Sequence, residues 1–203
     1  MSKLLVTGFT PFDGRKVNAS WIAAQALAKV PECLTLRLPV VWGEPQKRLE
    51  AACSAACPEM IVSLGEGREG WFDIETVAKN TRKERADNNG KQPSGIPISS
   101  EGPAELKATL DAGALLPELL EAGFPVRISG DAGGFLCEET LYTLELLKLR
   151  NQALKTVAFV HLPPYGTRLH YQGIDAICNE ELLSDFARVL IRSIRKIHHC
   201  AHE

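Results

Sequence analysis

The chain has 203 residues, 45% of them hydrophobic, which is enough for one α/β domain with a sizeable core. Its formal net charge of −2 gives no reason to expect nucleic acid or another polyanion as a partner. No apolar run approaches the ~20 residues that cross a bilayer, and the first residues lack a signal-peptide pattern, so we expect a soluble cytoplasmic protein without a membrane partner.

Short apolar runs alternate along the chain with segments of helical spacing. The predicted strands are residues 3–9, 34–41, 60–64, 71–78, 126–129 and 156–161, and the predicted helices are 20–30, 44–56, 115–122, 135–151 and 180–199. Two long segments, 80–103 and 163–179, are expected to be loops. The first is polar and rich in Gly, Pro and Asn, which is typical of a functional flap, an interface or disorder. This order of elements predicts a single domain over residues 1–203, an α/β sandwich with a mostly parallel (mixed) central sheet.

Cys137 follows the predicted strand 126–129 and a glycine turn, and it lies in the first turn of a predicted helix. The partial positive charge of a helix N-terminus favours a thiolate over a thiol. Glu138 and Glu139 oppose this, because a carboxylate close to sulfur disfavours the thiolate. A helix rotates by about 100° per residue, so Glu138 is expected to point away. A buried core cysteine stays open as the alternative.

His161 ends the predicted strand 156–161. The C-terminal ends of parallel strands share one edge of a sheet, so we expect Cys137 and His161 to meet there as nucleophile and general base. A third group should fix the tautomer of the imidazole. Glu75 is the preferred candidate, and Asp73 and Asp131 remain alternatives. The pattern indicates a cysteine hydrolase, which needs no metal or organic cofactor.

Three further features have competing interpretations. Phe9 and Phe12 lie in a turn-rich loop after the first strand, where they could line a small apolar pocket or simply cover the end of the sheet. The segment 65–70 matches G-x-G-x-x-G, but a strand rather than a helix is expected after it, so a nucleotide site is disfavoured. The C-terminal tail carries His198, His199, Cys200 and His202, which we interpret as a solvated helix end rather than a metal site.

Taken together, these segments resemble the pyroglutamyl peptidase type I (pyrrolidone-carboxylate peptidase) family of cysteine peptidases. The resemblance runs over nearly the whole chain in the same order. Its motifs are T-G-F-x-P-F-x-G at 7–14, L-P-V-x-[FW] at 38–42, the glycine loop at 65–68, the segment 74–80, a loop with Arg85, Asp87-Asn88 and Gly90 that resembles the family's R-x-x-D-N-x-G, the nucleophile segment 129–137 and the histidine segment 160–163.

The resemblance implies an α/β/α sandwich and a cysteine peptidase that hydrolyses the amide bond after an N-terminal pyroglutamyl residue through a thioester acyl-enzyme. It implies that Cys137, His161 and Glu75 form the catalytic triad. It also implies that Phe9 and Phe12 flank the lactam ring and that Arg85 lies close to the site. N-terminally pyroglutamylated peptides would be the substrates, and the protein would form a homodimer or homotetramer.

Three single positions depart from the family pattern, and the segment 163–166 after His161 is also unusual. The family usually has Asn-Pro where this chain has Asn18-Ala19, and it usually has Asn at the positions of Gly130 and Glu138. Because these residues lie beside the predicted catalytic centre, a catalytically weak or inactive relative that binds a pyroglutamyl-like ligand is the alternative.

Overall fold

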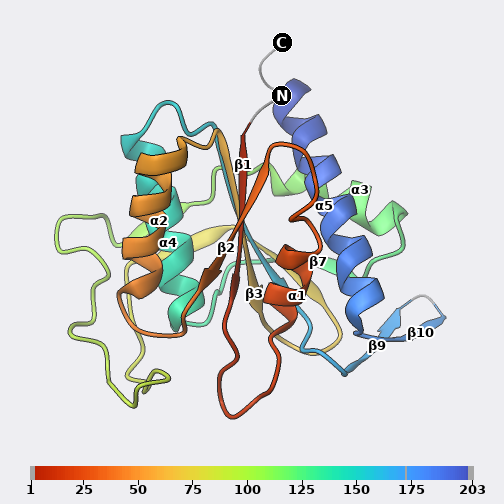
Figure 1. The fold of residues 1–203 in the computed structure, drawn as a ribbon, viewed down its shortest axis with the longest axis horizontal. Coiled ribbons are helices and arrows are strands. Elements are labelled where there is room, and N and C mark those ends of the chain that lie inside the picture. Colours follow the sequence, from red (N-terminus) through yellow and green to blue (C-terminus); the bar gives the residue numbers. More distant parts are fainter. Residues whose placement is uncertain (1–2, 172, 201–203) are drawn as a thin grey trace.

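The computed structural model describes residues 3–171 and 173–200. Six strands form the central sheet in the order β2-β1-β3-β8-β4-β7 (Figure 1). Their bounds are β1 Leu4–Phe9, β2 Cys33–Leu38, β3 Met60–Glu66, β4 Phe72–Glu75, β7 Val126–Ser129 and β8 Thr156–Leu162. Neighbouring strands are parallel except for β4 and β8, which pair antiparallel. The prediction of a mostly parallel, mixed sheet is therefore confirmed.

Helices cover both faces of the sheet and produce an α/β/α sandwich (Figure 1). One face packs against α1 (Ala19–Gln25), α3 (Ala112–Glu121) and α5 (Glu180–Cys200), and the other against α2 (Glu44–Ala56) and α4 (Leu136–Arg150). Helix α5 is amphipathic because its apolar residues recur at helical spacing, and Leu183, Phe186 and Leu190 are fully buried. Among the described residues, no helix combines the length and apolar character needed to cross a membrane.

The alternation of side chains along each strand gives the sheet two separate cores. In β8, Ala158 and Val160 pack on the α1/α3/α5 face, whereas Val157 and Phe159 pack on the α2/α4 face. His161 has the same parity as Phe159 and so lies on the α2/α4 face. This parity decides which polar side chains can meet under the N-terminus of α4.

The structure also differs from the sequence-based expectations in the loops. The predicted strand 71–78 is two strands, β4 and β5 (Val77–Lys79), and β5 pairs with β6 (Glu105–Lys107) outside the central sheet. The break lies at Thr76, whose backbone N–H and side-chain hydroxyl both donate to the carbonyl of Ser129. The predicted loop 163–179 contains a hairpin of β9 (Arg168–Tyr171) and β10 (Ile174–Ile177).

Candidate active site

Strand parity gathers the candidate catalytic groups on one face of the sheet. In β4, Phe72 and Ile74 enter the α1/α3/α5 core, which leaves Asp73 and Glu75 on the α2/α4 face. Asp73 is directly opposite His161 in the antiparallel β4–β8 pair, and Glu75 lies two residues further along β4. Polar side chains from two neighbouring strands therefore converge beneath the start of α4.

The strand directions correct one step of the sequence-based prediction. Strand β7, which precedes Cys137, runs parallel to β4 and therefore antiparallel to β8, which carries His161. The C-terminal ends of β7 and β8 thus point to opposite edges of the sheet. Cys137 and His161 meet because β4 and β7 each have only four residues and end close to the level of His161. The connection 130–135 then brings the first turn of α4 over the sheet, with Gly133 and Gly134 at φ values of 90° and 76° that glycine adopts without strain.

Three of these side chains lie in a row. Nδ1 of His161 lies 2.8 Å from Oε1 of Glu75, and both residues are buried. The sulfur of Cys137 lies on the other side of the imidazole, and its interaction with the ring raises the pKa of His161. Since Nδ1 faces Glu75, we infer that Nε2 faces the sulfur.

Gly65 of β3 lies directly beside the sulfur and the imidazole. A methyl group at Gly65 would lie 2.9 Å from Sγ of Cys137 and 3.0 Å from Cδ2 of His161. Only a residue without a side chain leaves room for the two reacting groups at this position.

Electrostatics at the site favours a protonated imidazole. Burial by itself lowers the pKa of His161, but the negative charges of Cys137 and Glu75 and their hydrogen bonds outweigh burial and raise this pKa to about 10. The imidazole is therefore protonated beside the sulfur of Cys137. Such a pair supplies a nucleophile and a proton donor together.

The two acids that follow Cys137 are directed elsewhere. Glu138 accepts a hydrogen bond of 2.7 Å from the backbone N–H of Lys79, and burial raises the pKa of its carboxyl group. Glu139 binds Nε of Arg82 at 2.6 Å and the backbone N–H of Gly43 at 2.8 Å. Both carboxylates join α4 to neighbouring segments and leave the sulfur uncovered.

The alternatives to Glu75 have other partners. Asp73 forms an ion pair with Arg127, its neighbour across β4 and β7. Asp131 lies 3.6 Å from both Arg68 and Lys79. Of the three acids proposed for the third position, Glu75 is the one whose carboxylate is hydrogen-bonded to His161.

A pocket of about 190 Å³ opens beside Cys137. Phe9, Phe12 and Phe135 supply its aromatic walls, and Arg85 lies at its rim. All six residues expected at the site therefore line one cavity: Cys137, His161, Glu75, Phe9, Phe12 and Arg85. The pocket is mostly apolar with a few convergent polar groups, as is typical of a site for a small ligand.

The segment 80–103 was expected to be a functional flap, an interface or a disordered loop. In the structure, hydrogen bonds hold it beside this pocket. Asp87 accepts hydrogen bonds from the backbone N–H groups of Asn89, Lys91 and Trp42. Asn88 donates to the carbonyl oxygen of Pro11 at 2.8 Å, which ties the segment to the turn that carries Phe12. These contacts hold the segment beside the site, where its Arg85 lines the pocket.

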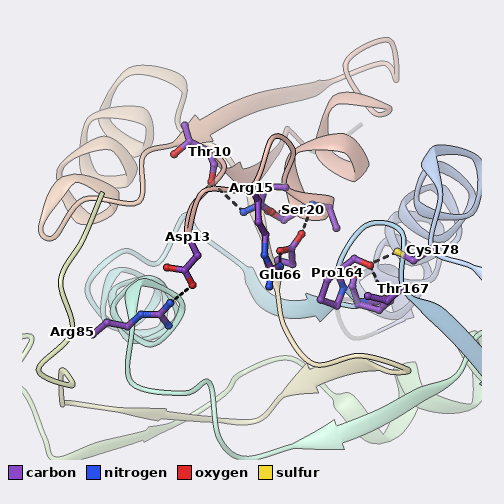
Figure 2. A network of polar contacts seen from close by, with 12 residues as sticks. Thr10, Asp13, Arg15, Ser20, Glu66, Arg85, Pro164, Thr167 and Cys178 are labelled. Carbon is purple, nitrogen blue, oxygen red and sulfur yellow. Dashed lines mark hydrogen bonds and ion pairs between the residues drawn. The ribbon is translucent and has the colours of Figure 1, made fainter. Parts of the chain in front are cut away.

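The sequence analysis did not assign Glu66 and Arg15 to the site. Glu66 lines the pocket, is almost fully buried and forms an ion pair with Arg15 (Figure 2). Its other oxygen accepts a hydrogen bond of 2.8 Å from the backbone N–H of Ala19. The available signal was a lone acid at the end of an otherwise apolar strand, which is costly to bury unless it has a partner.

Two other expectations concern cofactors and metals. The glycine segment 65–70 continues into β4 rather than opening a helix, so it lacks the helix N-terminus that a nucleotide diphosphate requires. Within residues 3–171 and 173–200, no group of three or more His, Cys, Asp or Glu side chains is placed to hold a metal ion. His202 of the C-terminal tail lies outside the described residues.

Comparison with known proteins identifies the family. The family profile described as pyroglutamyl peptidase matches residues 2–184. The pyrrolidone-carboxylate peptidase of Gloeobacter violaceus is 40% identical over 167 residues, which cover 79% of this chain and 81% of that protein. The enzyme of the same name from Erwinia tasmaniensis is 37% identical over 169 residues, 80% of this chain and 78% of its own.

Solved structures agree with this result. Pyroglutamyl peptidase I of Bacillus amyloliquefaciens superposes with a TM-score of 0.83 at 26% identity, covering 95% of this chain and 94% of that one. A mutant pyrrolidone carboxyl peptidase of Pyrococcus furiosus gives 0.82 at 26% identity, with coverages of 95% and 98%. The chain belongs to the pyroglutamyl peptidase family.

Proposed function

We propose that this protein is a cysteine-type omega peptidase that removes an N-terminal pyroglutamyl residue from peptides, with Cys137 as nucleophile, His161 as acid and base and Glu75 as the group that orients His161. The observation that carries the proposal is the row of Cys137, His161 and Glu75 at the wall of an aromatic pocket, with His161 hydrogen-bonded to Glu75. Family membership supplies the substrate class.

The first half of the reaction forms a thioester. The Cys137 thiolate attacks the pyroglutamyl carbonyl carbon, and the electron pair of the C=O bond moves onto oxygen. Backbone N–H groups in the first turn of α4 have no partner within the helix and can stabilise that oxyanion. The C–N bond then breaks as Nε2 of His161 donates its proton to the departing amine.

The second half releases the acyl group. His161, now neutral, accepts a proton from a water molecule that attacks the thioester carbonyl. The C–S bond breaks, pyroglutamate leaves, and the thiolate–imidazolium pair is restored. Glu75 holds Nδ1 of His161 throughout, so that Nε2 remains directed at the reacting atoms.

The pocket suits an uncharged ring. Phe9 and Phe12 offer apolar surface to the flat lactam, and the backbone can pair its amide group. The alternative of a relative that binds without turnover has no observation in its favour, since Glu138 is directed to Lys79 rather than to the sulfur. The cytoplasmic location and the homodimer or homotetramer expected from the sequence stay predictions.

Hydrolysis of pyroglutamyl-aminomethylcoumarin under reducing conditions tests the proposal. Wild type should release the fluorophore, and Cys137→Ala should not. Cys57→Ala is the matched control because Cys57 is an exposed thiol that caps α2, outside the pocket. A folded wild-type protein without activity, or a fully active Cys137→Ala variant, would overturn it.

A further inference from the structure

Two arginines from distant parts of the chain lie against the ring of Phe12. The guanidinium carbon of Arg15 is 5.2 Å from the ring centroid, and that of Arg85 is 5.8 Å away. Arg85 also lies 4.3 Å from the ring centroid of Phe135, which directly precedes α4. Both distances to Phe12 are within the range in which a cation is attracted to an aromatic face.

Each of these arginines is held by its own carboxylate (Figure 2). Nη2 of Arg85 is 2.5 Å from Oδ2 of Asp13, and Arg15 is paired with Glu66. The two pairs differ in environment: Asp13 and Arg85 are about half exposed, whereas the carboxylate of Glu66 is buried. The Asp13 pair is therefore the one that salt should weaken.

The backbone of Asp13 adopts a conformation that glycine would adopt more easily than aspartate. Asp13 has a φ of 53°, in the left-handed region where glycine fits with less strain, and Gly14 follows at 71°. A carboxylate at a strained position is accounted for when it makes a contact that glycine could not make.

We propose that Asp13 is a positioning residue: it holds Arg85 against Phe12 and Phe135, and so fixes the aromatic wall that receives the pyroglutamyl ring before the substrate arrives. Glu66, through Arg15, holds the other side of the same turn. The inference rests on the proposed function. A wall fixed in advance improves binding of the ring without changing the chemistry at Cys137, because less ordering remains to be done on binding.

The test compares Asp13→Gly, Asp13→Asn and Asp13→Glu with wild type. For Asp13→Gly and Asp13→Asn we expect KM for pyroglutamyl-aminomethylcoumarin to rise about two- to fivefold, with kcat nearly constant. Asp13→Glu should recover most of the loss. Asp13→Gly should melt at or above the wild-type temperature, since glycine relieves the backbone strain, which separates positioning from a general loss of stability.

Binding of 2-pyrrolidinone, an uncleavable lactam, measured by calorimetry, makes the test independent of turnover. In Asp13→Gly and Asp13→Asn, the Kd for this lactam should rise by the same factor as KM. Added salt should raise the Kd of wild type but not that of Asp13→Asn. Asp185→Asn, which removes an exposed ion pair of α5, is the matched control and should change neither quantity.

The outcomes separate the two proposals. No hydrolysis by wild type would refute the proposed function, and the lactam Kd would still report on Asp13. Wild-type KM and Kd in both Asp13→Gly and Asp13→Asn would refute the positioning role and leave the peptidase function standing. The positioning role would also be refuted if Asp13→Asn raised KM by the same factor in the Arg85→Gln variant as in wild type. The two residues are proposed to act as a pair, so the second change should then add little.

Discussion

Gly65→Ala tests the geometry of the site without altering a reacting group. Gly65 lies in β3, opposite His161 in the parallel β3–β8 pair. A Cβ atom there would lie 2.8 Å from Cζ of Phe159, 2.9 Å from Sγ of Cys137 and 3.0 Å from Cδ2 of His161. The φ of Gly65 is not in the left-handed region, so the backbone accepts alanine and the whole effect comes from these contacts.

The size of the effect follows from how far the neighbours must move. Ordinary van der Waals contact begins near 3.4 Å, so each of the three atoms must retreat by about 0.5 Å. Phe159 is fully buried and its ring packs edge-on against the ring of His161, so it has little freedom to yield. Cys137 and His161 must therefore separate or turn. Displacement by about 1 Å costs up to about 100-fold in rate, so we expect kcat/KM to fall by about 10- to 100-fold.

Stability should fall much less than activity. Overpacking a well-packed site costs about 1–3 kcal/mol, and alanine in a strand recovers part of this relative to glycine. The assay combines kcat/KM on pyroglutamyl-aminomethylcoumarin with the rate of inactivation by iodoacetamide and the free energy of unfolding in urea. Gly95→Ala is the control, since a Cβ at Gly95 has no neighbour within 4 Å.

One result would refute this reasoning. If Gly65→Ala kept kcat/KM within twofold of wild type and reacted with iodoacetamide at the same rate, the sulfur and imidazole would not be confined by β3 as described. Loss of activity in Gly95→Ala of the same size would show instead that the assay responds to glycine substitutions in general.

Further predictions concern three other residues. Glu75→Gln removes one of the negative charges that raise the pKa of His161, so the alkaline limb of the pH–rate profile should move to lower pH and kcat/KM should fall about 100-fold or more. Burial raises the pKa of Glu145 to about 7, above its value in the unfolded chain, so its contribution to stability is complete below about pH 4.5 and is lost as pH rises towards 7. Glu145→Gln should therefore be more stable than wild type near pH 8 by up to about 3 kcal/mol in urea unfolding, and a variant no more stable than wild type at that pH would contradict this. Burial also raises the pKa of the Cys178 thiol to about 12, so peptide mapping after brief iodoacetamide treatment should find Cys137 modified and Cys178 intact.

Much of the fold follows from local patterns in the sequence. The strand 126–129 and the helix 44–56 have the predicted bounds, because each is a uniform run ended by a clear signal: Pro125 and Gly130 around the strand, and Gly43 and Pro58 around the helix. The hairpin of β9 and β10 was missed, because its strands have only four residues each and pair with one another rather than with the sheet.

The sequence alone could not decide between Asp73 and Glu75 as the partner of His161. Asp73 and Glu75 have the same parity in β4, so alternation places both on the α2/α4 face and cannot choose between them. The choice depends on the register of β4 against β8 and on Arg127 across from Asp73, both of which arise from pairings between distant segments. The antiparallel direction of β8 relative to β4 and β7 is likewise absent from any local pattern.

The three departures from the family pattern acquire a physical meaning only in the structure. Ala19 has a backbone N–H that proline would lack, and this N–H donates to Glu66 in the pocket wall. A Cβ at Gly130 would meet only Val77 within 4 Å, and Glu138 binds the backbone of Lys79. None of the three places a side chain against Cys137 or His161. Their effects should therefore fall on the wall of the pocket and on the anchoring of α4 rather than on the pairing of sulfur and imidazole.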